Sequence, residues 1–280
     1  MSGDVVLDVA GVTKSFGLRQ TLTERVTRQE RAVHRAVDDV SFALRRGEIL
    51  GLAGGSGSGK TTLARCLIRL VEPDAGTVTL GGADMLAARG GELRELRRRM
   101  QMVFQDPYAS LNPRMSVGDA LLEAGRVHRR PGAEDGEAFV RTLLERVHLS
   151  ESFAARKPRE LSGGQRQRVA IARALAVDPE VLIADEAVSA LDVSVQAQLL
   201  RLFVDLRAEL GVAIVFVAHQ LAVIAEICDR VAVMQTGRIV ELGATADVFR
   251  APQHEYTRAL LAAHPQPDPA RRMRAATVAA

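Results

Sequence analysis

Three segments of the chain together constrain how it can fold. Residues 161–165 read Leu-Ser-Gly-Gly-Gln, and residues 181–186 read Val-Leu-Ile-Ala-Asp-Glu. The first is a glycine-rich helix start that can hold a phosphate, and the second is an apolar strand that ends in two carboxylates. Upstream, residues 54–61 read Gly-Gly-Ser-Gly-Ser-Gly-Lys-Thr, which fits the phosphate-loop pattern G-x-x-x-x-G-K-[ST]. Because such a loop joins a strand to a helix, we expect an α/β fold.

Short apolar segments alternate with helical patterns along the chain. Residues 49–53 are apolar and bounded by glycine, which predicts a strand buried on both faces. Further strands are predicted at 100–104, 181–184 and 213–217, and helices at 60–71 and 193–210, the second ended by Gly211. This alternation is typical of βαβ units.

More strands are predicted on either side of this pattern. Val5, Leu7 and Val9 alternate with other residues, as in a half-buried edge strand. The charged stretch 21–35 predicts an inserted surface loop or a fraying hairpin. We also predict a strand at 40–44, which turns at Arg46-Gly47. The last two strands, 230–234 and 238–242, are predicted to form a hairpin around Thr236-Gly237.

The stretch from 106 to 160 differs from the rest because it contains no strand candidate. Phe139, Leu143, Leu144 and Val147 have helical spacing, which predicts an inserted helical subdomain. Ser162 is a good N-cap for the following helix, expected to run to about residue 177. We divide the chain into 1–105 (β subdomain and first part of the core), 106–160 (helical subdomain), 161–248 (second part of the core) and 249–280 (tail, with a short helix near 256–263).

Composition argues against several classes of protein. No apolar run approaches the roughly 20 residues of a membrane span, and no secretory signal is expected at the N-terminus. Cys66 and Cys228 predict two buried thiols in a reducing compartment. The net charge of +3 arises from 37 basic and 34 acidic side chains, mostly interspersed, so we expect no nucleic-acid partner.

The phosphate loop and the residues beside it predict an ATP site. Its glycines aim successive N–H groups at one anion, and the next helix adds its positive end. Lys60 can reach the β- and γ-phosphates, and the Thr61 hydroxyl can ligate Mg²⁺. The nucleotide-binding residues expected here are Gly54, Gly55, Ser56, Gly57, Ser58, Gly59, Lys60, Thr61 and Thr62.

Asp185 and Glu186 end a predicted buried strand, where open α/β sheets bind ligands. Asp185 is expected to hold Mg²⁺, and Glu186 to orient or deprotonate the attacking water. The alternative for this pair is that the carboxylates only cap the next helix.

Together, the three segments resemble the ATP-binding cassette (ABC) family, the motor subunits of membrane transporters, over residues 5 to 263. The resemblance implies a P-loop NTPase (RecA-like) α/β core with a small antiparallel β subdomain and an inserted α-helical subdomain. It also implies that two cassettes pack head to tail, so that each ATP is held by the phosphate loop of one chain and by Ser162, Gly163, Gly164 and Gln165 of the other.

The resemblance assigns roles to further residues. Gln105 would sense Mg²⁺ and the attacking water and link them to the helical subdomain. His219 would contact the γ-phosphate, Asp192 would help couple the two sites, and Phe16 would stack on adenine. For Phe16 the alternative is packing at the end of a strand on the small sheet.

Three positions depart from the family pattern. Gly55 stands where glutamate is common, Ala187-Val188 replaces the commoner Pro-Thr, and Gln220 replaces the usual aspartate after the histidine. No required donor or carboxylate is lost, so these changes bear on rates and leave the chemistry intact.

Residues 105–114 and 186–198 resemble the oligopeptide/dipeptide/nickel importer branch, as does the tail at 253–261, with Glu255 where proline is usual. This branch implies a second ABC subunit, two transmembrane permeases and, indirectly, an extracytoplasmic solute-binding protein. It also implies a peripheral location on the cytoplasmic face of a bacterial inner or plasma membrane.

The expected function is therefore an ATPase that drives an importer. The alternative is a soluble ABC-type ATPase that acts on DNA or ribosomes without permeases. The cargo, the choice between homodimer and heterodimer, and the roles of the insertion at 17–41 and of the shortened tail stay open.

Overall fold

The computed structural model describes residues 4–17, 33–106, 111–189 and 191–263. Its central sheet has six strands in the order β10-β9-β3-β8-β7-β6, all parallel except β10, which pairs antiparallel with β9. The strands are β3 (Ile49–Ala53), β6 (Met100–Val103), β7 (Val181–Asp185), β8 (Ala213–Val217), β9 (Arg230–Gln235) and β10 (Arg238–Ala244). The four predicted core strands and the predicted hairpin all correspond to strands of this sheet, although β6 ends one residue before the predicted 104.

A second, antiparallel sheet has the order β2-β1-β4-β5. It contains β1 (Val5–Gly17), β2 (Val33–Arg45), β4 (Ala75–Leu80) and β5 (Ala83–Asp84). The prediction of an edge strand around Val5 is wrong, because β1 lies between β2 and β4. Of the stretch 21–35, residues 21–32 lie outside the described part, and residues 33–35 open β2.

The helices largely follow the predicted ranges. They are α2 (Lys60–Leu67), α3 (Gly90–Arg99), α5 (Val117–Val127), α6 (Gly136–Arg146), α7 (Gly163–Leu175), α8 (Val193–Leu210), α9 (Leu221–Ile227), α10 (Thr245–Arg250) and α11 (Glu255–Ala262). Helix α2 ends earlier than predicted, because Arg69 adopts left-handed backbone with φ 57°. Helices α3, α9 and α10 and strands β4 and β5 were not predicted.

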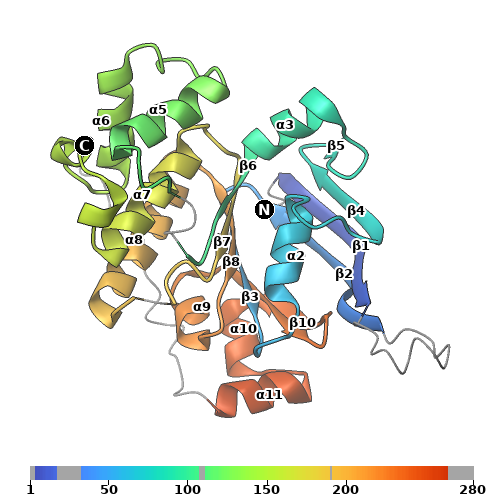
Figure 1. Cartoon of the computed structure of the whole chain (residues 1–280). Coiled ribbons are helices and arrows are strands. Elements are labelled where there is room, and N and C mark those ends of the chain that lie inside the picture. The colour runs from blue at the N-terminus through green and yellow to red at the C-terminus, as the bar shows by residue number, and fades with distance from the viewer. Residues whose placement is uncertain (1–3, 18–32, 107–110, 190, 264–280) are drawn as a thin grey trace, which may run out of the picture.

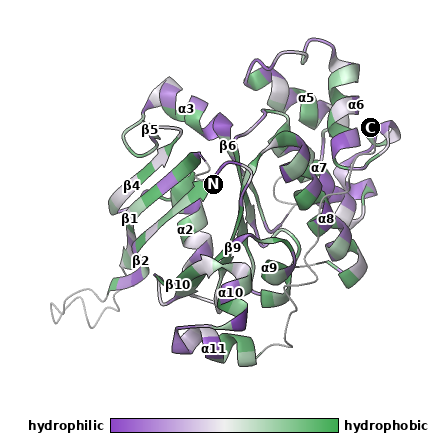
Figure 2. Ribbon diagram, turned by 180° about the vertical axis from the view of Figure 1, so that it is seen from behind, coloured by the Kyte–Doolittle hydropathy of each residue, from purple (hydrophilic) through white to green (hydrophobic). Residues whose placement is uncertain are grey.

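The parallel strands at the centre of this sheet are buried on both faces, and their side chains alternate between two hydrophobic cores. In β7, Leu182 and Ala184 face α7 and α8, whereas Val181 and Ile183 face α2 and the antiparallel sheet. Figure 1 shows α7, α8 and α9 on one side of the sheet and α2 with the small sheet on the other. In Figure 2, β1 and α9 are largely hydrophobic, and α3 at the rim is largely hydrophilic.

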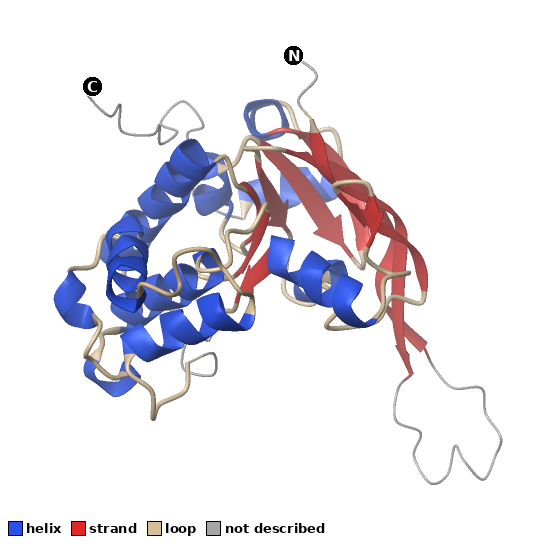
Figure 3. Ribbon diagram, turned by 90° about the horizontal axis from the view of Figure 1, so that it is seen from above, coloured by secondary structure: helices blue, strands red, loops and turns tan. Residues whose placement is uncertain are grey.

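Between β6 and α7 the described residues form helices and no strand, as the spacing of apolar residues predicted. Two short 3-10 turns, Glu151–Phe153 and Pro158–Glu160, lead into α7. Figure 3 shows most helices gathered on one side of the molecule and the antiparallel strands on the other. Within the described residues, no helix is long and apolar enough to cross a membrane. Cys66 and Cys228 are both buried, as expected, and they form no disulfide with one another.

Candidate nucleotide-binding and hydrolysis site

The phosphate loop connects β3 to α2, and its tight path requires glycine. Gly54 and Gly59 have φ values of 146° and 102°, in the region that side chains rarely adopt. A Cβ on Gly54 would meet the Met234 carbonyl, and one on Gly59 would meet the Ala36 carbonyl. The Gly237 N–H also donates to Ser58 O at 3.0 Å. Strand β2 and the β9–β10 turn therefore fix the loop from two sides.

Lys60 opens α2, and its ammonium is held inside the loop. Its Nζ donates to Gly54 O at 2.8 Å, to Gly55 O at 2.9 Å and to Ser58 Oγ at 3.3 Å. The side chain is buried, and this burial lowers the pKa of Lys60, although Glu186 and Asp185 oppose the shift. The loop thus concentrates one positive charge where phosphates bind.

Thr61 and Asp185 form a pair of oxygen donors beside Lys60. The Thr61 hydroxyl donates to Asp185 Oδ1 at 3.0 Å. Burial raises the pKa of Asp185, and the Thr61 hydrogen bond opposes that rise. No group of three or more His, Cys, Asp or Glu side chains in the described residues could cage a metal ion. One hydroxyl and one carboxylate nevertheless fit Mg²⁺, which is usually bound by one or two carboxylates together with substrate phosphates.

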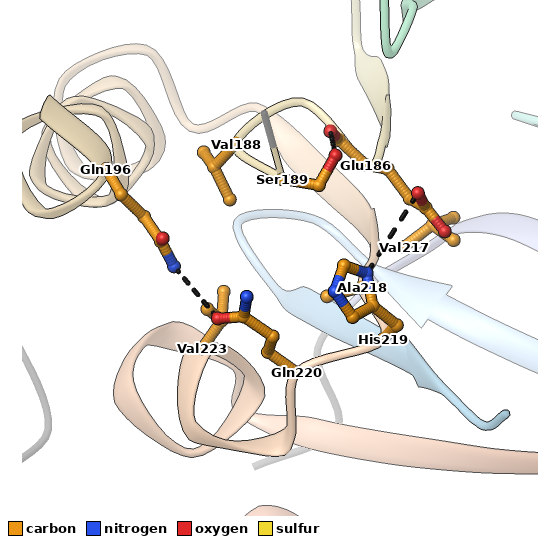
Figure 4. A pocket seen from close by; sticks show the side chains of 9 residues that line it. All are labelled: Glu186, Val188, Ser189, Gln196, Val217, Ala218, His219, Gln220 and Val223. Atoms are coloured by element: carbon orange, nitrogen blue, oxygen red, sulfur yellow. Dashed lines mark hydrogen bonds and ion pairs between the residues drawn. The ribbon is translucent and has the colours of Figure 1, made fainter. Parts of the chain in front are cut away.

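Three predicted catalytic side chains meet at the carboxyl ends of neighbouring strands. Gln105, after β6, donates its Nε2 to Glu186 Oε2 at 2.9 Å, and His219 Nδ1, after β8, lies 4.0 Å from the same oxygen. Figure 4 shows the Glu186 carboxylate and the His219 ring pointing toward one another. Glu186 itself has a φ of 49°, and such strained backbone is typical of functional sites.

A cavity of about 320 Å³ lies over the phosphate loop. It is lined by Phe16, His34, Ala36, residues 56–62 and Glu186. The ring of Phe16 is 43% exposed, and the Lys14 ammonium lies 5.6 Å from its centroid. Sequence reasoning missed His34 and Ala36, because only strand register reveals them: His34 pairs with Phe16 across β2 and β1.

The glycine-rich start of α7 does not line this cavity. Ser162 caps α7 by accepting the Gln165 N–H at 3.3 Å, and the Gln165 side chain accepts the Ser162 N–H at 2.9 Å. This is the capping role predicted for Ser162. Gly163 lies against Leu191, just before α8, and Gly164 lies against α8 itself, where a Cβ on Gly164 would meet Val195. Asp192 caps α8 by accepting the Val195 N–H at 2.9 Å, and hydrogen bonds from Val195 and Ser194 lower its pKa.

The residues that depart from the family pattern have defined contacts in the structure. Ala187 and Val188 are both buried in the core that faces α8. Gln220 precedes α9 without capping it, and its Oε1 accepts the Gln196 amide at 3.4 Å, as Figure 4 shows. The Gly55 N–H donates to the Tyr256 hydroxyl of α11 at 2.9 Å, a contact that sequence reasoning did not predict.

The fold has two sheets and carries a phosphate loop, an acidic strand end and a second glycine-rich helix start. These features define an ATP-binding cassette of the ABC type. Family models agree with this class: the ABC transporter model matches residues 37–189, and the model of the oligopeptide/dipeptide transporter C-terminal region matches residues 240–279. The chain belongs to the ABC transporter family, in its oligopeptide/dipeptide branch.

Relatives of known name support the same assignment. The chain is 51% identical over 269 residues, 96% of its length, to the glutathione import ATP-binding protein GsiA of Pectobacterium atrosepticum. It is also 51% identical over 271 residues to GsiA of Escherichia coli strain K12. The chain covers only 42% and 43% of these two relatives, so it spans about two fifths of their length.

Solved structures match the fold. The ATP-binding cassette MJ0796, in a dimeric post-hydrolysis state with ADP and Pi, aligns with a TM-score of 0.73 at 28% identity, covering 85% of this chain and 98% of that one. The protein cbiO1 from Clostridium perfringens, part of the transporter complex cbiONQ, aligns with a TM-score of 0.74 at 27% identity, covering 89% and 92%. Both support the predicted P-loop core with an antiparallel β subdomain.

Proposed function

We propose that this chain is the ATP-hydrolysing motor subunit of an importer, coupling ATP turnover at a dimer interface to uptake of peptides or a related small solute such as nickel. One observation carries the proposal. Lys60, Gln105, Glu186 and His219 follow four different strands of the central sheet and meet at one edge, beside a cavity that can hold phosphates.

The proposed reaction follows from the donors at this edge. Lys60 and the loop N–H groups bind the phosphates, and Phe16 stacks on the base. Thr61 and Asp185, together with Gln105, would hold Mg²⁺, and the bound ion would supply positive charge to the phosphates. Glu186 accepts the proton of the attacking water, and Gln105 holds the carboxylate in place with its hydrogen bond. His219 donates toward the γ-phosphate from the other side of Glu186.

A second copy of the cassette completes the site in this proposal. The N-terminus of α7, with Ser162, Gly163 and Gly164, is a second anion-binding feature that does not line the phosphate-loop cavity. In this arrangement one ATP contacts the phosphate loop of one chain and the N-terminus of α7 of another. This explains why each chain contains two anion-binding features. Asp192, exposed at the start of α8, is then available to couple the two sites.

The importer assignment rests on the relatives. Their names specify glutathione import, and glutathione is a small peptide, which supports a peptide-class cargo over nickel. Permease partners are supported by the cbiO1 neighbour, described as part of a transporter complex. We propose that the chain works with two permeases on the cytoplasmic face of the membrane, paired with a second ABC subunit, and indirectly with a solute-binding protein.

The proposal is tested in two steps. Mg²⁺-dependent ATPase activity of the purified chain should rise more steeply than linearly with protein concentration, because the site needs two copies. Uptake of labelled glutathione, a dipeptide and nickel is then compared in a strain with and without the gene. Loss of uptake of one solute supports the importer. Unchanged uptake of all three, with ATPase activity stimulated by DNA, would favour the soluble alternative.

A further inference from the structure

The C-terminal helix α11 is docked beside the phosphate loop by an ordered network. Before α11, Glu241 of β10 accepts the backbone N–H of Gln253 at 2.8 Å and of His254 at 3.1 Å. Burial raises the pKa of Glu241, but the neighbouring donors, with the Gln253 N–H foremost, together hold that pKa below its usual value. His254 then caps the helix by accepting the Tyr256 N–H at 3.1 Å. Figure 1 shows α11 next to the turn between β3 and α2.

From this position, Tyr256 reaches a single peptide group of the phosphate loop. Its hydroxyl accepts the Gly55 N–H at 2.9 Å, and the carbonyl of the same peptide, Gly54 O, accepts the Lys60 ammonium at 2.8 Å. The peptide plane between Gly54 and Gly55 is therefore held at both ends. Any rotation that broke the bond to Tyr256 would also move the oxygen that orients Lys60.

The absence of a side chain at Gly55 permits this contact. A Cβ there would lie 3.1 Å from the Tyr256 hydroxyl, which is closer than most real Cβ contacts. Tyr256 does not line the cavity over the loop, so its effect on nucleotide must pass through the peptide and Lys60. Two other supports of the loop act at different residues, since the Gly237 N–H donates to Ser58 O and β2 packs on Gly59.

We propose that Tyr256 is a positioning residue for ATP binding, through which the C-terminal helix orients the phosphate loop and Lys60. The inference rests on the proposed ATP binding at this loop. In this proposal the C-terminal region contributes to nucleotide binding in addition to packing against the core. In the proposed site Lys60 binds the phosphates. Loss of the Tyr256 hydroxyl should therefore weaken ATP binding more than it slows hydrolysis of bound ATP.

The test is Tyr256→Phe in the full chain, which keeps the ring and removes only the hydroxyl. A lost hydrogen bond predicts an ATP dissociation constant higher by about 2- to 10-fold. KM for ATP should rise with it, while kcat changes less than about 2-fold. Arg258→Gln is the matched control, because the Arg258 side chain donates to Pro252 O and Gln253 O, in the segment just before α11, and has no hydrogen bond to the phosphate loop among the described residues. This control should leave ATP affinity unchanged.

The outcomes separate the two proposals. If the unaltered chain binds no ATP, the proposed function fails. If it binds ATP and Tyr256→Phe binds equally well, the inference alone is wrong. If both variants weaken ATP binding in proportion to a fall in melting temperature, α11 is only a packing element, and the positioning role is refuted.

Discussion

Replacement of Glu186 by glutamine tests the proposed chemistry most directly. Glu186 follows a fully buried strand, adopts left-handed backbone with φ 49°, and accepts the Gln105 amide at 2.9 Å. Glutamine has the same length, and its Oε1 can accept the same hydrogen bond, so the local geometry should persist. The substitution removes only the carboxylate that can take a proton from water.

The expected slowing of hydrolysis follows from the loss of this one carboxylate. Removal of a general base slows a reaction by about 10²- to 10⁴-fold, which is about 2.7–5.4 kcal/mol of barrier. ATP affinity should be unchanged, because Lys60 keeps its three loop contacts and the glycine N–H groups are untouched. Slow hydrolysis with intact binding should also preserve the ATP-bridged dimer.

The assay combines single-turnover hydrolysis with equilibrium ATP binding and size-exclusion chromatography. Glu95→Gln is the control, because Glu95 pairs with Arg98 at 2.6 Å on α3 and does not line the cavity. It should hydrolyse ATP at the rate of the unaltered chain. Near-normal turnover in Glu186→Gln would remove Glu186 from the mechanism and refute the reasoning. A dimer that fails to form with ATP would refute the shared site.

Three predictions concern the stability of the fold. Gln220→Asp should stabilise by about 0.5–1 kcal/mol, because an aspartate can cap α9; an unchanged denaturation midpoint would contradict this. Gly51→Ala should destabilise by about 1–3 kcal/mol, because its Cβ would lie 2.8 Å from Ile224 Cδ1, whereas Gly91→Ala, with open space around it, should not destabilise. Burial raises the pKa of Asp185, so ionisation costs stability as the pH rises through that pKa. Asp185→Asn should therefore have the higher free energy of unfolding at neutral pH, with no advantage below about pH 4, the usual pKa of an aspartate; an equal gain in acid would be inconsistent with this reasoning.

Local sequence predicted most of the core because the signals there are strong. The strands at 49–53 and 213–217 and the helix at 193–210 have the predicted bounds, since continuous apolar runs and a glycine stop mark them clearly. Strand β4 and helices α3 and α9 were missed. Helix α3 has ten residues, of which only Leu96 is buried, so little apolar periodicity marks it. The seven residues of α9 begin without a side-chain cap, so no start signal marks that helix.

The residues of the candidate site likewise include some that local sequence marks and some that it does not. The sequence predicted Lys60, Asp185 and Glu186 as site residues because each lies at or beyond the carboxyl end of a recognisable strand, and such ends meet at one edge of a sheet. Neither His34 nor Tyr256 carries such a signal. His34 reaches the cavity because antiparallel pairing sets it opposite Phe16, and Tyr256 reaches Gly55 across 201 positions of the chain.

The sequence by itself determined the class of protein. Phosphate binding needs glycine, lysine and carboxylate residues in a fixed local order, and that order is present in the sequence. Only the tertiary structure decided which distant side chains support that loop. Strand register and helix docking depend on packing between segments far apart in the chain, and no local pattern specifies them.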